Sequence, residues 1–234
     1  PTETTTELKI ETFTFSSNGT DINGKIYLPD SYEANANLPA IFLIDFTETE
    51  QVFNEVYDEF EKVIDGVQQI QDFDALVVTL EEHLDFESLP GAFQDIYPIF
   101  KDLASYVDNN YTNNTSRTFI GRGREAGIVN MTMFLEDSET SVFDNFIATD
   151  SPIYFNKNVI NMIENNDFPQ NKQNKKLHFS FSNTNDFISC ANMITEINDA
   201  EYTWLQFESK QYFGDYGTTY PAAFRAGIKF IFSN

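Results

Sequence analysis

Short apolar runs recur along the chain and alternate with stretches that have the spacing of amphipathic helices. Runs such as residues 38–45 and 75–80 lack the in-out alternation of a half-exposed strand, so they indicate strands buried on both faces, as in a parallel sheet. The helical stretches supply the crossovers that parallel strands need. The pattern predicts an α/β three-layer sandwich whose central sheet is mostly parallel.

The predicted elements cover the whole chain without an evident linker. We expect strands at residues 8–15, 26–28, 38–45, 75–80, 117–121, 145–149, 177–181 and 202–207, and helices at 52–64, 93–107, 126–135, 188–197 and 222–232. The first two strands, with turns at Asn18-Gly19 and Asn23-Gly24, should form an antiparallel flank at one edge. Residues 1–234 are interpreted as a single domain with a flexible start at residues 1–7.

Charge and cysteine usage exclude several classes of function. A net charge of −23 repels nucleic acid and anionic membrane surfaces, so neither is expected as a partner. The charge serves either solubility or recognition of a cationic partner. The single cysteine, Cys190, permits neither a disulfide within the chain nor a cysteine-based metal site. No apolar run reaches the 18 residues of a membrane span, and no cofactor is expected.

The first seven residues are polar and rich in threonine. Such a start resembles that of a mature exported protein, which predicts a periplasmic, secreted or surface-attached location, although a cytosolic protein with a frayed end would read the same way.

Sites in a doubly wound sheet lie at the carboxyl ends of the strands. Here the strand that ends at Gly121 leads directly into a helix through Arg122-Gly123-Arg124-Glu125. In α/β-hydrolases this junction is the nucleophile elbow, Gly-x-Ser-x-Gly. We therefore expect Gly123 to occupy a sharp strand-to-helix turn.

The surrounding segments resemble the α/β-hydrolase esterase family that includes enterochelin esterases and esterase-D-like enzymes. Four segments carry the resemblance, from about residue 13 to residue 232: the strand end at 41–45, the Arg-Thr-Phe-Ile-Gly strand at 117–121, Phe-Asp-Asn-Phe-Ile-Ala with Ser-Pro at 143–152, and the closing helix at 220–232. The resemblance implies the fold of these enzymes and the positions of a Ser, an acid and a His.

The residues at those positions depart from the family pattern. Gly123 stands where the family has its serine, and Tyr216 stands where it has its histidine. Of the residues after the strand ending at 181, only Asp186 could serve as the acid. Glycine has no nucleophilic atom, and a tyrosine with an ordinary pKa near 10 cannot relay protons at neutral pH as imidazole can.

Neighbouring positions depart as well. Arg122 replaces the histidine before the nucleophile, Glu125 replaces a glycine, and Phe46 replaces the glycine that helps form the oxyanion pocket. Together with Asp45, Arg124 and Ser151, these residues are expected to line the cleft. The chain is thus interpreted as a catalytically degenerate esterase-like protein, a pseudoenzyme that binds a small molecule or a protein of unknown identity. The alternative is an active serine-type hydrolase with a relocated nucleophile.

Few residues could supply relocated chemistry. Ser151 starts a Ser-Pro turn, Cys190 is expected to be a buried inert thiol, and His178 is expected to be packed within a strand. His83 lies beside Glu81, Glu82 and Asp85, but it lacks metal-ligand spacing, so no metal site is predicted.

Two arginines at a helix start admit two interpretations. Arg122 and Arg124 could form a small anion site, because guanidinium groups and helix N-termini both favour anions. They could instead form internal salt bridges with Glu125, Asp45, Asp186 or Asp215 and fill the space that the triad left.

Overall fold

The computed structural model describes residues 8–45, 58–81 and 89–233. Its strands are β1 (Ile10–Ser17), β2 (Thr20–Tyr27), β3 (Ala40–Ile44), β4 (Leu76–Leu80), β5 (Arg117–Arg122), β6 (Asn145–Thr149), β7 (Lys175–Ser182) and β8 (Leu205–Tyr212). Its helices are α1 (Glu59–Gln68), α2 (Leu89–Asn110), α3 (Arg124–Leu135), α4 (Ile153–Asn165), α5 (Phe187–Asp199) and α6 (Tyr216–Phe232).

The described strands form one sheet in the order β1-β2-β4-β3-β5-β6-β7-β8. β1 pairs antiparallel with β2 and β2 pairs antiparallel with β4, whereas the strands from β4 through β8 are parallel to one another. The predicted α/β class, the mostly parallel sheet and the antiparallel edge are therefore confirmed. All the parallel strands direct their carboxyl ends to the same edge.

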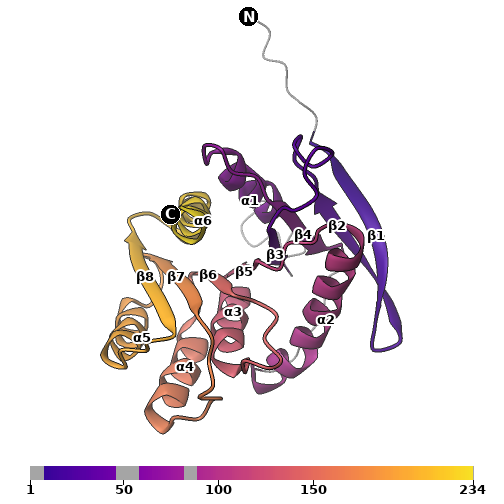
Figure 1. Cartoon of the computed structure of the whole chain (residues 1–234). Coiled ribbons are helices and arrows are strands. Elements are labelled where there is room, and N and C mark those ends of the chain that lie inside the picture. The colour runs from indigo at the N-terminus through magenta and orange to yellow at the C-terminus, as the bar shows by residue number, and fades with distance from the viewer. Residues whose placement is uncertain (1–7, 46–57, 82–88, 234) are drawn as a thin grey trace, which may run out of the picture.

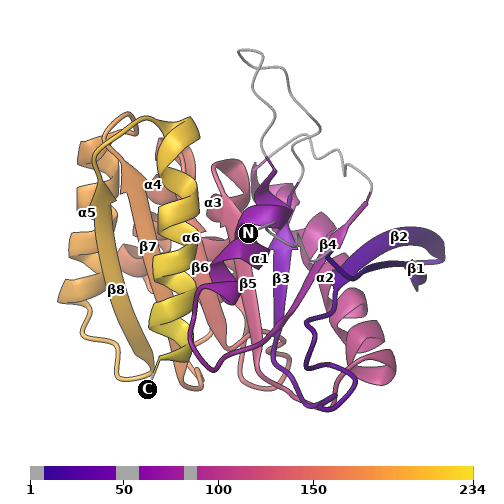
Figure 2. The same cartoon turned by 90° about the horizontal axis from the view of Figure 1, so that it is seen from above.

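Helices cover both faces of the sheet. Figure 1 shows α1 and α6 side by side on one face and α2, α3, α4 and α5 on the other. Viewed from the α1 and α6 side, α6 runs lengthwise beside β8 and over β7 (Figure 2). Within the described ranges, no helix has the length and apolarity needed to cross a bilayer.

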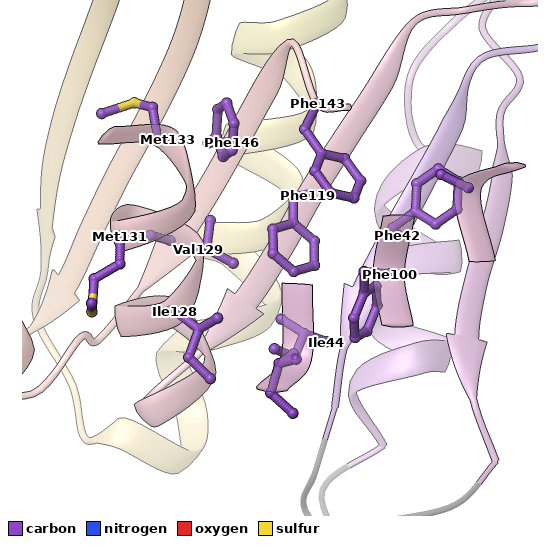
Figure 3. Close-up of a cluster of buried hydrophobic side chains, with 14 of the residues drawn as sticks. Phe42, Ile44, Phe100, Phe119, Ile128, Val129, Met131, Met133, Phe143 and Phe146 are labelled. Atoms are coloured by element: carbon purple, nitrogen blue, oxygen red, sulfur yellow. The ribbon is translucent and has the colours of Figure 1, made fainter. Parts of the chain in front are cut away.

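Aromatic packing dominates the core between the sheet and the larger helical layer. The Phe119 and Phe143 rings stack with centroids 4.5 Å apart, and Phe42 and Phe100 pack against this pair at 5.6 and 5.0 Å (Figure 3). These side chains project from β3, β5, α2 and the segment before β6, so they hold the central strands against α2. β3 and β5, which lead to the edge where sites are expected, are therefore among the best-buried strands of the sheet.

Several local expectations were wrong. Asn23-Gly24 is not a turn but lies within β2, where Gly24 pairs with Phe13 and leaves room for its ring. The hairpin turns only at Asn18-Gly19, where both residues have positive φ. α4 was missed altogether, and α6 begins at Tyr216, with Asp215 as its N-cap and Pro221 inside the helix. β8 begins and ends later than expected, since Leu205 is its first residue.

Three predictions fall on residues outside the described ranges: the flexible start at 1–7, the oxyanion position Phe46, and the His83 loop.

Candidate functional site

Gly123 forms the sharp turn between β5 and α3. Its φ of 63° and ψ of −127° lie in a region that glycine adopts at little cost and that other residues rarely enter. Its amide donates to the carbonyl oxygen of Thr149 at 2.8 Å, which ties the turn to the end of β6. The predicted strand-to-helix turn at Gly123 is thus confirmed.

Tyr216 occupies the space beside this turn. A Cβ atom built on Gly123 would collide with the Tyr216 hydroxyl and would contact the Tyr216 Cζ atom at 3.5 Å. Burial raises the pKa of the Tyr216 hydroxyl, although Arg122 acts in the opposite direction, so the phenol is neutral near pH 7. At position 123 the chain therefore lacks both a reactive side chain and the room for one.

Arg122 is the most deeply buried arginine of the described chain, with 1% of its surface exposed. Its Nε atom lies 2.5 Å from Oε1 of Glu59, the first residue of α1. Its guanidinium carbon lies 4.3 and 4.4 Å from the ring centroids of Tyr216 and Tyr220. Both tyrosines come from α6, so this one side chain joins β5, α1 and α6. The interpretation as an internal ion pair holds for Arg122, but its partner is Glu59, which the sequence did not indicate.

Carboxylates crowd around this guanidinium. Burial acts to raise the pKa of Glu59, the charge of Arg122 opposes this and favours the carboxylate, and Asp45 and Glu125 add repulsion. Burial likewise raises the pKa of Glu125 to about 7, and hydrogen bonding to its own backbone and the nearby arginines lower it. Glu125 lies in the first turn of α3, where the helix N-terminus attracts negative charge. Oε2 of Glu125 would lie 3.7 Å from a Cβ atom built on Gly123, so a carboxyl group that titrates near pH 7 lies beside the turn.

A cleft of about 450 Å³ opens in front of the turn. It is lined by Gly123, Arg124, Asp150, Pro152, Tyr154, Thr184, Asn185 and Tyr216. Of the expected cleft residues it contains Arg124, together with the expected triad positions Gly123 and Tyr216. Asp45 does not line it, and Arg122, Glu125 and Ser151 are buried.

Asp150 is the carboxylate that lines the cleft. It follows β6 and has a strained positive φ of 60°. Its Oδ1 atom accepts hydrogen bonds from the amide and the hydroxyl of Ser182, at 2.6 and 2.9 Å. Within the described structure, its buried Oδ2 atom has no hydrogen-bond partner. Burial raises the pKa of Asp150.

Asp186 has a different role from the acid that the resemblance implied. Its Oδ1 atom accepts from the Ser189 amide at 2.6 Å, so it is the N-cap of α5. Asp186 is absent from the cleft lining, whereas Asp150 is part of it. Ser151 is fully buried, and its backbone carbonyl accepts from Asn156 and Asn185 at 3.1 and 3.2 Å.

The other candidate reactive groups are packed in the interior. His178 lies in β7, 3.4 Å from Glu208 and beside the Phe230 ring, and burial lowers its pKa to about 4. The Cys190 thiol is buried, which raises its pKa to about 12, as expected of an inert thiol. In the part of the chain that is described, no imidazole lines the cleft.

Solved structures with this architecture are serine hydrolases and esterases. The IroE-like serine hydrolase from Shewanella oneidensis superposes with a TM-score of 0.71 at 16% identity, covering 96% of this chain and 80% of that one. The siderophore hydrolase EstA from Aspergillus nidulans gives 0.67 at 11% identity, covering 95% and 93%. The BES protein from Bacillus cereus gives 0.63 at 15% identity, covering 95% and 94%. The chain has the α/β-hydrolase fold of these esterases. No family model matches the sequence, and neither does any curated protein.

In the α/β-hydrolase fold, the nucleophile is carried on a sharp strand-to-helix turn at the carboxyl edge of the sheet. Gly123 lies on a turn of this shape, and we use the name apolar rim for the exposed apolar side chains that follow strand ends at the same edge. Five of the six exposed large apolar side chains in the described chain follow the carboxyl ends of β6, β7 and β8: Ile153, Tyr154, Phe187, Ile188 and Phe213. Phe213 is 87% exposed and Ile188 is 70% exposed. Of the five, Tyr154 lines the cleft, and exposed apolar side chains at the edge where sites lie are typical of a binding surface.

Sequence reasoning missed Glu59, Tyr220 and Asp150. Asp150 was within reach, because it directly follows a predicted strand at the edge where sites lie. Glu59 gave no signal, since an acidic residue in the first turn of an amphipathic helix ordinarily faces solvent.

We predict strong coupling between positions 123 and 216. Gly123→Ala should destabilise the protein by about 2–4 kcal/mol, because it adds backbone strain and a collision with the Tyr216 hydroxyl. Adding Tyr216→Phe should recover at least about 1 kcal/mol by removing the colliding atom. Urea denaturation of the two single variants and the double variant measures this coupling; additive effects would contradict the proposed contact.

We also predict that Glu125 makes the folded protein less stable as pH rises. Its folded pKa is raised from 4.5 to about 7, so the folded state binds this proton more tightly than the unfolded chain does. The associated stability is complete below about pH 4.5 and is lost as pH rises through about 7. Relative to the wild type, Glu125→Gln should therefore gain up to about 3 kcal/mol between these limits. Denaturation at pH 5 and pH 8 tests this, with the exposed Glu164→Gln as the control. An equal change at both pH values would contradict the prediction.

Proposed function

We propose that the protein is a catalytically inactive member of the α/β-hydrolase fold that acts as a binding protein through the cleft at the carboxyl edge of its sheet. One observation carries the proposal: the Tyr216 hydroxyl fills the space that a nucleophilic side chain on residue 123 would need. The turn keeps the backbone shape that an elbow requires, while its reactive atom and the room for it are both missing.

The groups around the turn support the loss of acyl-transfer chemistry. Arg122 is held by Glu59 and by two tyrosine rings, so it is not available to a substrate. Glu125 places a carboxylate at the start of α3, where an active enzyme directs hydrogen-bond donors at a developing negative charge. Removing one such donor costs a hydrolase about 10²–10³ in rate, and here a carboxyl group that is partly ionised near pH 7 lies beside the turn.

The rim supports retention of a binding role. In this very acidic chain, five of the six exposed large apolar side chains of the described residues follow strand ends at the edge that carries the cleft, and Tyr154 lines the cleft itself. An uncharged apolar group could cover Phe213 and Ile188 and reach the cleft beside Tyr154. The proposed ligand class is therefore a molecule, or a side chain of a partner protein, with an exposed apolar group.

We expect no ester hydrolysis above buffer with short-chain p-nitrophenyl esters, and no serine labelling by a fluorophosphonate probe. Gly123→Ser with Tyr216→His should restore turnover only feebly, because Glu125 and the Arg122 ion pair remain. Gly123→Ser alone is the matched control, since it adds the nucleophile without a base. Robust turnover by the double variant would mean that the cleft is still built for catalysis. Labelling of the wild type would favour a relocated nucleophile.

We expect the rim to bind apolar probes. Nile red, which is uncharged, should fluoresce more strongly with the wild type than with a Phe213→Ser, Ile188→Ser double variant, because these two side chains offer the largest exposed apolar surface. Ile10→Ser removes an exposed apolar side chain from β1, far along the sheet order, and should leave the signal unchanged. An equal loss of Nile red fluorescence in the rim variant and in the control variant would contradict a specific apolar site.

A further inference from the structure

A second cavity, of about 690 Å³, lies away from the cleft, on the face of the sheet that α1 and α6 cover. It is lined by residues from the segment after α1, from the edge strand β8 and from α6, and Figure 2 shows α6 running between α1 and β8. Three of its lining residues are cations: Lys210 on β8, and Arg225 and Lys229 on α6. We call this cavity the basic groove.

The composition of the basic groove is opposite to that of the protein. The chain has 37 acidic residues and 14 lysines and arginines, yet the groove lining contains three cations and no carboxylate. Among the described residues, none of the three cations forms a salt bridge. The nearest carboxylate along β8 is Glu208, which lies 3.4 Å from the buried His178. The positive charge of the groove is therefore not neutralised from within.

Uncharged side chains, and not carboxylates, contact two of these cations. Arg225 Nη1 donates to Oε1 of Gln69 at 2.5 Å, and Lys210 Nζ lies 4.8 Å from the centroid of the Tyr212 ring. The Tyr212 hydroxyl donates to the Ala222 carbonyl at 3.2 Å, which joins β8 to α6 across the groove. Burial raises the pKa of Tyr212, while Lys210 and Arg225 act in the opposite direction. Both cations therefore lie close enough to Tyr212 to stabilise negative charge on its hydroxyl.

General stability requirements explain only part of this arrangement. Lys229 lies in the last turn of α6, where a cation complements the helix dipole. Arg225 lies one turn earlier on the same helix face, and like charges four residues apart repel each other. Lys210 comes from another element and lines the same cavity. An anion bound among the three would relieve the repulsion between the two cations of α6.

We propose that the basic groove binds a small-molecule oxyanion, a phosphate or carboxylate group held by Lys210, Arg225 and Lys229. The cavity volume is within the range of small-molecule sites. A guanidinium and two ammonium groups donate charge-assisted hydrogen bonds that suit either type of oxyanion. A small ligand fits better than a long polyanion. An extended anion would be repelled by the net charge of −23 along most of its length, because salt screens the attraction of the groove beyond short distances. This inference is independent of the function proposed for the cleft.

Calorimetric titration with inorganic phosphate and with citrate, at constant ionic strength, tests the proposal. We expect saturable binding of at least one of these anions at one site per chain. Arg225→Gln, and separately the Lys210→Gln, Lys229→Gln pair, should weaken it at least about tenfold through lost charge-assisted hydrogen bonds. Which anion binds more tightly distinguishes a phosphate site from a carboxylate site.

Lys157→Gln is the matched control, because it removes one positive charge from an exposed position on α4. If Lys157→Gln weakens binding as much as Arg225→Gln does, the effect is one of net charge and the proposal is overturned. It is also overturned if neither anion binds saturably to the wild type. The substituted side chains are exposed, and unchanged circular dichroism and melting temperature would exclude misfolding as the cause of lost binding.

Discussion

The ion pair between Arg122 and Glu59 is the interaction on which the arrangement of the site depends. It buries a guanidinium and a carboxylate together and places the guanidinium against two rings of α6. A buried pair of this kind adds little net stability compared with apolar packing, but removing one partner leaves an uncompensated charge and costs about 3–5 kcal/mol. The last residue of β5, the first residue of α1 and the start of α6 are therefore fixed relative to one another. Tyr216 is held against Gly123 as a result.

The fold of this protein does not depend on the residues that would carry out catalysis. The parallel sheet, the helical layers and the strained turn at Gly123 are those of an α/β-hydrolase, and sheet and core do not require a functional triad. A serine in such a turn has unfavourable backbone angles, whereas glycine adopts them at little cost. Once glycine stands at this position, a neighbouring side chain can fill the free volume, and here Tyr216 does so.

The sequence was sufficient to predict the features that depend on local pattern. Short apolar runs identified the buried strands, and the segment around Gly123 identified the turn, because both depend on residues close together in the chain. The turn predicted at Asn23-Gly24 is wrong, because a residue pair that favours turns also fits a strand where the glycine faces an aromatic ring. The Arg122 partner could not be predicted, since Glu59 reaches it only after α1 has packed on the sheet. Asp150 and Asp186 each come after a predicted strand, and of the two only Asp150 lines the cleft, while Asp186 caps α5.

The open edge of the sheet at β8 has a consequence for the protein in crowded solution. An edge strand presents unpaired backbone groups that can recruit a strand from another molecule. On β8 the consecutive residues Glu208, Ser209 and Lys210 are all exposed, so a second sheet approaching this edge would have to desolvate opposite charges at adjacent positions. Charged edges of this kind are a common defence against edge-to-edge aggregation. Lys210 would thus serve solubility even when the groove beside it is empty, and replacing both charges with β-branched residues would create a seam for fibril growth.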